Sequence, residues 1–430
     1  MINIKNIRLK KPEMKNIRLL IQKLQEKLQT WFYREEEATQ KEAQSDEMMD
    51  LSSKLRMQKR RIRIRTVAIT AAVVTMVAGT AIYRYVRVFR EYSIVESVER
   101  SDDAVTKYAR VKNRILKCNP NGVTCVNKAN EVQWNTTFTM QSPMVDECED
   151  MVVVGDQRGS EIYVFNEKGL VGNFDVEYTL VKVRVAAQGV VAAIMEDGDT
   201  TWVNVYDANG DILVKNKTSM AESGYPVDMD ISSDGQKMVV SYLGIDNSNV
   251  KSRIAFYNFS SVGQGQANNL VSSAEYSGHV VPQTIFLDSN YAVAYRDDGL
   301  TFFSGRQVPE ETKAVQVDQE MISVFSSEDY VGYVTLNSNE DRKEKYYAQI
   351  FRKNGSRSAE LFFDTEYRDI KMEGEDLILY NSNEIEIYTA NGSHKFSGQY
   401  EKQIVEVSKL NGSRRYSVQT LDSTDEIHIK

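Results

Sequence analysis

The sequence contains few residues of the kinds that most catalytic and covalently braced proteins need. Only 3 cysteines, 6 prolines and 3 histidines occur among 430 residues. The cysteine content excludes a disulfide-dense secreted scaffold, and the proline content excludes collagen-like and proline-rich chains. Three histidines leave little material for metal sites or nucleophile triads, and no HExxH, GxSxG or Walker sequence occurs. We therefore expect no enzyme activity, no cofactor and no bound metal.

Charge is unevenly distributed along this chain, whose net charge is −8. Residues 1–65 carry an excess of eight positive charges, whereas the remaining residues carry an excess of sixteen negative charges. Thr66–Tyr83, where the two regions meet, is a run of eighteen residues without any charge. As a helix this run extends about 27 Å, close to the ~30 Å hydrocarbon thickness of a bilayer. We interpret it as a transmembrane helix rather than as a buried core helix.

The flanks of the uncharged run predict its orientation. Seven Lys and Arg side chains lie between Lys54 and Arg65, and only three arginines follow the run closely. The positive-inside rule then places the N-terminus in the cytoplasm and the acidic body outside. A cleaved signal peptide is disfavoured, because its basic region would be 65 residues long. We expect a single-pass signal anchor in the cell membrane, with residues 84–91 as a juxtamembrane linker.

The first 65 residues are predicted to form a cytoplasmic helical head. No glycine occurs between Pro12 and Leu55, and apolar residues recur at three- and four-residue steps from Ile17 to Phe32. Such a helix can support self-association, dock a cytoplasmic partner or lie on anionic lipid; a solvated tail is the fourth interpretation. The basic residues beside the span are explained as a topology signal, so no nucleic-acid partner is expected.

Residues 92–430 are predicted to form an all-β domain built from repeats. Short runs rich in Val, Ile and Tyr alternate with Asn-Gly, Asp-Gly and Lys-Gly turns. One class of run recurs eight times at a mean spacing of 43 residues, the period of a four-stranded propeller blade. We predict an eight-bladed β-propeller, with seven blades as the alternative. The eight runs are centred on Ile115, Val152, Val190, Val239, Ala292, Val331, Leu377 and Tyr416.

The two ends of this domain predict how the ring closes. The C-terminal segment offers three strands and then stops, so the eighth blade lacks a fourth strand. Ser93–Val98 has the composition of a strand and can supply it. Pairing both chain ends in one blade would remove the open sheet edges of an unclosed ring. If Arg114–Trp134 merged with the C-terminal strands instead, the ring would have seven blades.

Several segments resemble known propeller repeats. Gly122–Trp134 resembles the pyrroloquinoline-quinone-type repeat, with Trp134 in the place of its docking tryptophan but without the Asp and Gly of its turn. Asp228–Tyr242 resembles the SPDG-type blade of TolB-like and WD-type propellers. With the apolar span and Ser142–Gly169, these segments resemble a domain-of-unknown-function family of membrane-anchored propellers from clostridial Gram-positive bacteria. The resemblance implies a single-pass envelope protein and supplies no catalytic residue or substrate.

The cysteines allow one covalent link. Cys118 and Cys125 flank the turn sequence NPNG, so a disulfide across this hairpin is reasonable outside the cell. A pair of free thiols is the alternative. Cys148 is left over and is expected to be a small buried side chain.

The other candidate residues favour structural roles. The YDANGD segment that begins at Tyr206 spaces its oxygens like a calcium loop, but it lacks the downstream Glu and suits a hairpin turn better. The histidines are scattered over different blades and are expected to be structural: His279, His394 and His428. Three long connections are the candidate partner-binding loops: Gly244–Lys251, Val262–Gly278 and Ser338–Lys345.

The function expected from these features is that of a non-enzymatic, membrane-anchored scaffold. Its extracytoplasmic propeller would bind a protein or cell-wall ligand through the loops and the axial face. One alternative is a hydrolase or lyase, which would need Asp, Glu or His side chains converging on the axial channel. The other is a signal relay from the propeller to the cytoplasmic helix. The fold does not decide among these functions, because propellers serve many.

Overall fold

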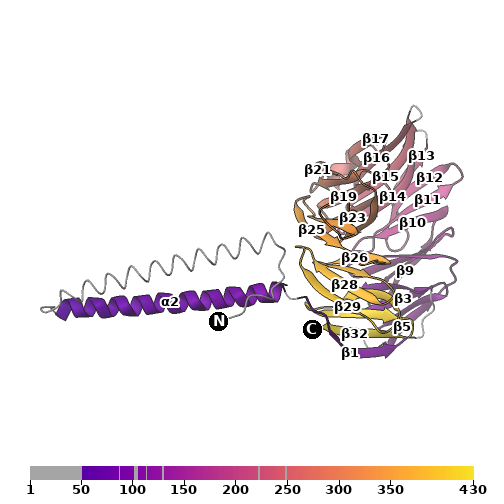
Figure 1. Cartoon of the computed structure of the whole chain (residues 1–430). Coiled ribbons are helices and arrows are strands. Elements are labelled where there is room, and N and C mark those ends of the chain that lie inside the picture. Colours follow the sequence, from indigo (N-terminus) through magenta and orange to yellow (C-terminus); the bar gives the residue numbers. More distant parts are fainter. Residues whose placement is uncertain are drawn as a thin grey trace. The chain divides into compact units, whose positions relative to one another are not determined.

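The computed structural model describes residues 51–86, 88–100, 105–112, 114–127, 130–220, 223–246 and 249–430 (Figure 1). Most of the predicted cytoplasmic head lies outside these residues. The chain divides into two units, Met1–Arg87 and Val88–Lys430, and we describe each by itself.

The first unit contains the helix α2, which spans Leu51–Val86. The uncharged run Thr66–Tyr83 lies within it and is helical, as predicted. The hydroxyls of Thr66 and Thr70 each donate a 2.7 Å hydrogen bond to the carbonyl four residues earlier, so the helix itself satisfies these polar groups. Within the described residues, no helical stretch is both long and apolar enough to cross a membrane. Membrane insertion of this run therefore stays a prediction.

The second unit is an eight-bladed β-propeller, as predicted. Each blade is a four-stranded antiparallel sheet, and blades 1 to 7 each use four consecutive strands. The first strand of each blade lines the axis of the ring, and the fourth lies at the perimeter. The apolar runs recognised in the sequence are the second strands of these blades, with Val190 directly before its strand.

Blades 1 to 4 occupy residues 107–277. Blade 1 contains β2 (Lys107–Val111), β3 (Arg114–Asn119), β4 (Gly122–Val126) and β5 (Val132–Thr137). Blade 2 contains β6 (Pro143–Cys148), β7 (Met151–Asp156), β8 (Glu161–Asn166) and β9 (Gly169–Asp175). Blade 3 contains β10 (Thr179–Val185), β11 (Val191–Asp197), β12 (Thr200–Tyr206) and β13 (Ile212–Ser219). Blade 4 contains β14 (Tyr225–Ile231), β15 (Lys237–Asp246), β16 (Asn249–Asn258) and β17 (Leu270–Ser277).

Blades 5 to 8 complete the ring. Blade 5 contains β18 (Gln283–Phe286), β19 (Tyr291–Arg296), β20 (Gly299–Ser304) and β21 (Glu310–Gln316). Blade 6 contains β22 (Met321–Ser326), β23 (Tyr330–Leu336), β24 (Tyr346–Arg352) and β25 (Arg357–Phe363). Blade 7 contains β26 (Asp369–Glu373), β27 (Asp376–Tyr380), β28 (Glu384–Thr389) and β29 (His394–Gln399). Blade 8 contains β30 (Ile404–Lys409), β31 (Arg415–Thr420), β32 (Ser423–Ile429) and β1 (Tyr92–Glu99).

Blade 8 closes the ring by combining both ends of the domain, as predicted. Its strand order is β1-β32-β31-β30, and β1 pairs antiparallel with β32 from Tyr92↔Ile429 to Glu99↔Ser423. The predicted closing strand Ser93–Val98 lies within β1. The seven-bladed alternative is wrong, because β2 to β5 form a blade of their own.

The outer strand of every blade carries a β-bulge near its start. The pairing register shifts by one residue there in all eight blades. In blades 2 and 3 the extra residues are Val171 and Leu213, both exposed. Because a bulge twists an edge and interrupts its ladder, this device protects the perimeter from pairing with other chains.

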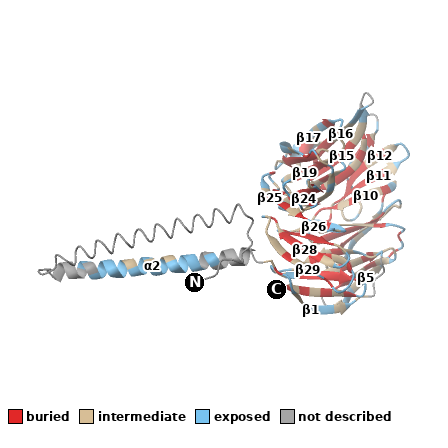
Figure 2. Ribbon diagram, in the orientation of Figure 1, coloured by how far each residue is buried: buried red, intermediate tan, exposed pale blue. Residues whose placement is uncertain are grey.

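The hydrophobic core is divided among the interfaces between neighbouring blades (Figure 2). Seven clusters of buried apolar side chains fill the interfaces from blades 1–2 round to blades 7–8. Among the described residues no such cluster fills the eighth interface, between blade 8 and blade 1. We call this interface the seam. It is crossed by polar contacts, such as the 3.0 Å hydrogen bond from Arg110 Nη1 to the carbonyl of Lys409.

Candidate functional site

The inner strands enclose a polar cavity of about 540 Å³ at the axis. Its lining comes from blades 1 to 6, so residues far apart in the sequence meet there. Carboxylates outnumber cations: the acidic side chains of the lining are Asp146, Glu147, Glu149, Asp230, Asp288 and Glu328, and the basic ones are Arg110 and Arg184.

Arg184 links three inner strands within this cavity. From β10, its guanidinium lies 3.0 Å from Asp146 on β6 and 3.5 Å from Asp230 on β14. On the same strand, Lys182 forms an ion pair with the buried carboxylate of Asp228. Alternating acidic and basic inner strands therefore balance part of the charge at the axis.

The same carboxylates also join neighbouring strands by accepting backbone hydrogen bonds. Asp146 accepts the N–H of Val185 at 2.8 Å, and Asp230 accepts the N–H of Phe286 at 2.7 Å. Asp228 accepts the N–H of Thr284 at 2.7 Å. These bonds reach from one blade to the inner strand of the next, so they hold the ring together at its axis.

Burial changes the protonation of this group. Burial raises the pKa of Asp230 to about 7, an effect that Arg184 opposes and Asp146 strengthens. Burial also raises the pKa values of Asp146 and Glu147. Burial lowers the pKa of Arg184, but the surrounding carboxylates outweigh it and raise the pKa overall. With this pKa, the Asp230 carboxyl group can exchange a proton near neutral pH.

A second polar cavity, of about 440 Å³, shares Asp146 and Glu147 with the first. It extends towards blades 7 and 8, where Asp369, Tyr380 and Glu406 line it. Acidic groups from blade 2 and from blades 4 to 8 thus line the axis. The alternative function, an enzyme acting at the axis, would need Asp, Glu or His side chains that converge there. The structure shows carboxylates converging at the axis.

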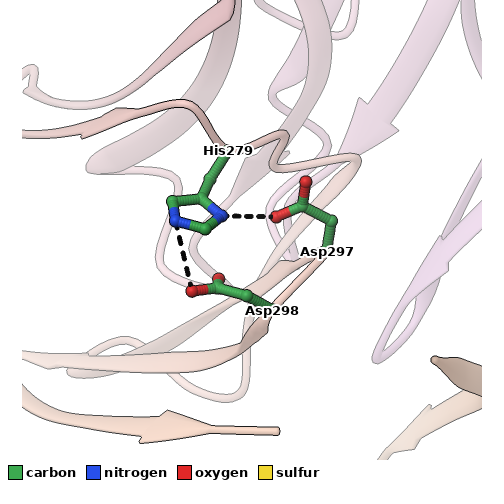
Figure 3. A group of neighbouring side chains, drawn as sticks. All are labelled: His279, Asp297 and Asp298. Carbon is green, nitrogen blue, oxygen red and sulfur yellow. Dashed lines mark hydrogen bonds and ion pairs between the residues drawn. The ribbon is translucent and has the colours of Figure 1, made fainter. Parts of the chain in front are cut away.

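A second cluster lies at the connection from blade 4 to blade 5 (Figure 3). The imidazole of His279 stands between two carboxylates, with Nδ1 3.1 Å from Asp297 Oδ1 and Nε2 3.5 Å from Asp298 Oδ2. In the described part of the chain, these side chains are the ones spaced closely enough to hold a metal ion.

The geometry of this cluster suits an ion-paired turn better than a metal centre. The two carboxylates approach opposite nitrogens of one ring, whereas a metal ion takes a single nitrogen from each imidazole. Arg296 Nε lies 2.9 Å from Asp298 Oδ1 and already supplies a positive charge. Asp297 also accepts the backbone N–H of Val280 at 3.2 Å, which ties the connection to the turn after β19.

The cysteines are all free thiols in the structure. Cys118 pairs with Val123 and Cys125 with Leu116, so the two cysteines lie diagonally across the β3–β4 hairpin rather than opposite each other. Diagonal Cβ atoms are about 7 Å apart, whereas a disulfide needs about 4 Å. The structure contains Cys118 and Cys125 as free thiols, and the disulfide between them stays a prediction. Burial raises the pKa of the Cys118 thiol to about 12, so neither nucleophilic nor metal-binding thiolate is available there.

Two local predictions agree with the geometry. Trp134 stacks on Phe165 of blade 2 at 5.7 Å and donates a 3.1 Å hydrogen bond to the carbonyl of Glu167, as a docking tryptophan would. Asp207 accepts backbone hydrogen bonds from Asn209 and Asp211, both at 2.9 Å, and these bonds lower its pKa. The YDANGD segment is therefore the turn between β12 and β13.

The three long connections differ in structure. Gly244–Lys251 is the tip of a hairpin, since β15 and β16 are ten residues long each; Ile245 at this tip is 76% exposed. Val262–Gly278 contains the outer strand β17, preceded by the short helices α3 (Ser261–Gln264) and η2 (Ala267–Asn269). Ser338–Lys345 is an irregular loop between β23 and β24. The extra chain in the second connection is the segment with α3 and η2, and the rest of that connection is the regular outer strand β17.

The axial carboxylates were missed by sequence reasoning. Some of them alternate with apolar residues on an inner strand, as in the DMDI sequence that contains Asp228 and Asp230, whereas Glu149, Asp288 and Glu328 lie just after inner strands. Acidic or basic residues in the first strands of six of the eight blades were the available signal. It was not used, because the period was established on the second strands.

The fold and the axial site define an eight-bladed β-propeller with an acidic channel. More particularly, the chain belongs to the family of unknown function DUF5711, whose family model matches residues 85–429. No curated protein matches the sequence.

Among solved structures, the designed Ika8 protein and a eukaryotic initiation factor share the architecture. BamB from Moraxella catarrhalis is 12% identical, with 79% of this chain and 100% of that chain covered and a TM-score of 0.48. The computationally designed Ika8 protein is 10% identical, with 80% and 99% covered and a TM-score of 0.50. A eukaryotic initiation factor is 10% identical, with 79% and 87% covered and a TM-score of 0.51. At such identities these likenesses concern the fold alone.

Proposed function

We propose that this chain is a non-enzymatic, membrane-anchored scaffold whose propeller binds a basic segment of a partner protein at the axial cavity. The observation that carries the proposal is the lining of the 540 Å³ cavity, where six carboxylates face two guanidinium groups. A cavity with excess charge of one sign attracts and orients groups of the opposite sign. Lys or Arg side chains of a partner are the groups that fit it.

Two features of the cavity favour binding. Glu149 and Glu328 line it and are exposed, so they are accessible to an incoming cation. Thr284 is 1% exposed, and its hydroxyl oxygen has no hydrogen-bond partner among the described residues. A buried hydroxyl without a partner costs free energy, which an incoming polar group would recover.

The test is a titration of the full-length chain with a Lys/Arg-rich peptide and with its uncharged Gln-substituted counterpart. The double variant Glu149→Gln/Glu328→Gln is expected to weaken binding of the basic peptide about three- to tenfold, and added salt should weaken it further. Glu310→Gln/Glu320→Gln removes equal charge from exposed positions outside the cavity and is the matched control. Equal binding by both double variants, or equal affinity for both peptides, would contradict the proposal.

An axial enzyme is the second candidate, and Asp230 is the observation that favours it. A carboxyl group with a pKa of about 7 can serve as a general acid or base near neutral pH. Its oxygens are already engaged, because one accepts the N–H of Phe286 and the other lies 3.5 Å from Arg184. We therefore rank it below the scaffold. Hydrolysis of a substrate by the wild type but not by Asp230→Asn would reverse this ranking.

Membrane anchoring is proposed from the sequence of α2. The uncharged run Thr66–Tyr83 and the seven basic side chains before it support a single-pass anchor with the propeller outside the cell. Alkaline extraction of membranes should leave the full-length chain in the pellet and release the variant Val73→Arg/Val74→Arg. A tag after Lys430 should be digested by protease added to intact cells. Protection of that tag would contradict the orientation.

A further inference from the structure

The seam between blades 8 and 1 contains a small cavity that is separate from the axis. Its volume is about 90 Å³, several times the ~10–15 Å³ that one water molecule needs. Both blades contribute to its walls: Val98 and Leu410 come from blade 8, and Ile115 and Val126 come from blade 1. These aliphatic side chains face the cavity, whereas a packed apolar cluster fills each of the other seven interfaces.

One polar group in this cavity lacks a partner. Gln419 on β31 lines the cavity and is 4% exposed, and its Oε1 has no hydrogen-bond partner among the described residues. Leaving a buried acceptor unpaired costs free energy. Turning the Gln419 amide so that Oε1 faces the cavity would let a hydrogen-bond donor placed there remove that cost, so the site favours a ligand with such a donor.

The charges around the cavity do not favour an ion of either sign. Lys117 lies on one wall, and Glu96 and Glu426 lie on the other. Glu426 is also paired with Arg415, which cancels its charge. With both signs present at the rim and aliphatic walls inside, the cavity suits an uncharged molecule.

From these observations we infer that the seam is a binding site for a small, uncharged, mainly aliphatic molecule that carries one hydrogen-bond donor. The aliphatic part would lie between Ile115 and Leu410, and the donor would reach Gln419 Oε1. Such ligands combine apolar contact with a single orienting polar group, as is usual in protein pockets. The site does not depend on the proposed axial function, because no residue lines both this cavity and the 540 Å³ cavity; Tyr108 borders this cavity and the 440 Å³ cavity.

The probes for this site are 2-methylpropan-1-ol and its methyl ether, which differ in the hydroxyl donor. Each would be titrated into the deuterated full-length chain while the backbone amide resonances of Ser417 and Gln419 are followed. The alcohol is expected to shift these resonances saturably, with an affinity about fivefold higher than that of the ether.

The variant Gln419→Met keeps the side-chain length but removes the acceptor, so it should abolish the preference for the alcohol. The matched control is Thr335→Val on β23, since Thr335 is 1% exposed and its hydroxyl also has no partner among the described residues. This control should bind both probes as the wild type does. The inference is overturned if neither probe shifts the seam resonances at saturation, if both bind equally, or if Gln419→Met retains the preference.

Discussion

The interface between blades 7 and 8 and the seam between blades 8 and 1 use opposite faces of the same blade. On β31, Tyr416 and Val418 point into the apolar cluster shared with blade 7. Ser417 and Gln419, the alternate residues, line the seam. On β27, in contrast, Leu377 and its neighbours are apolar on both faces. A strand buried between two blades is continuously apolar, whereas a strand beside the seam alternates.

This difference indicates which interfaces contribute most to the stability of the ring. Burial of the apolar clusters stabilises their interfaces by a free energy proportional to the apolar area removed from water. The seam instead relies on directed polar contacts, such as the stacking of Arg100 over the Tyr108 ring at 4.9 Å. Polar contacts contribute less net free energy because both partners were hydrated before folding. The seam is therefore expected to be the weakest of the eight interfaces.

Removing β1 should give the largest loss in the free energy of unfolding, because β1 is the outer strand of blade 8, which forms one side of the seam. A chain that begins at residue 105 leaves β32 without its partner, and we expect a loss of about 5 kcal/mol or more, comparable with the whole stability of many domains. Urea unfolding measures this loss. The control is a chain that begins at residue 88 and keeps β1. A truncated chain that unfolds as cooperatively as this control would show that blade 8 does not need its fourth strand.

A matched pair of leucines tests the comparison directly. Leu379 is fully buried in the cluster between blades 6 and 7, and Leu410 is half-buried at the seam. Leu379→Ala should lower the free energy of unfolding by about 2–5 kcal/mol, and Leu410→Ala by about 1 kcal/mol or less. Denaturant midpoints at constant m-value give both quantities. Equal losses would mean that the seam is as well packed as the other interfaces.

The axial carboxylates add a pH dependence to the interface between blades 4 and 5. Asp230 has a folded pKa of about 7, whereas an unfolded Asp has a pKa of about 4. Between these values the folded chain keeps a proton that the unfolded chain has lost, so stability should fall as pH rises from about 4 to 7.

Asp230→Asn removes this titration and keeps an oxygen for the N–H of Phe286. As the pH rises from 4 to 7, the free energy of unfolding of the variant should increase relative to that of the wild type, by on the order of 1–3 kcal/mol. Urea unfolding at each pH measures this difference. Asp199→Asn, which removes a carboxylate from the exposed turn between β11 and β12, is the control. Parallel pH profiles for Asp230→Asn and the wild type would show that Asp230 ionises normally.

A substitution that adds apolar surface at the seam should give the smallest change in the free energy of unfolding. Gln419→Met removes a buried acceptor that lacks a partner and adds apolar surface, so we expect a gain of about 1 kcal/mol in the free energy of unfolding. Thermal unfolding of both proteins without any alcohol measures the difference. Ser408→Ala, which loses a hydroxyl bonded to Lys371, should destabilise instead and serves as the contrast. A loss of stability in Gln419→Met would mean that its side chain is satisfied in solution.

The fold was predictable because its signals are local and repeated. The second strands of blades 2 to 7 are mainly apolar on both faces, and the spacing of all eight second strands gave the blade count. The composition of Ser93–Val98 indicated the closing strand. Trp134 and the turn at Asp207 were also recognisable from short sequences. Each of these features is visible in a short stretch of sequence or in its repetition along the chain.

The sites were not predictable to the same degree, because they depend on contacts between blades. Asp146 and Asp230 lie 84 positions apart and meet only through Arg184. The seam joins Ile115 with Leu410, nearly 300 positions away. The diagonal placement of Cys118 and Cys125 required the hairpin register, which the sequence alone leaves open.

Among the described strands β1 comes first in the chain and pairs with β32, so it waits longest for its partner. More than 320 residues separate Glu99 from the start of β32, which at about 5–20 residues per second corresponds to tens of seconds of translation. During that interval Ile94 and Val95 stand on a strand with no neighbour. The ring can therefore close only after β32 has been translated. A chain whose translation stops within blade 8 before β32 would leave β1 without a partner and the ring open.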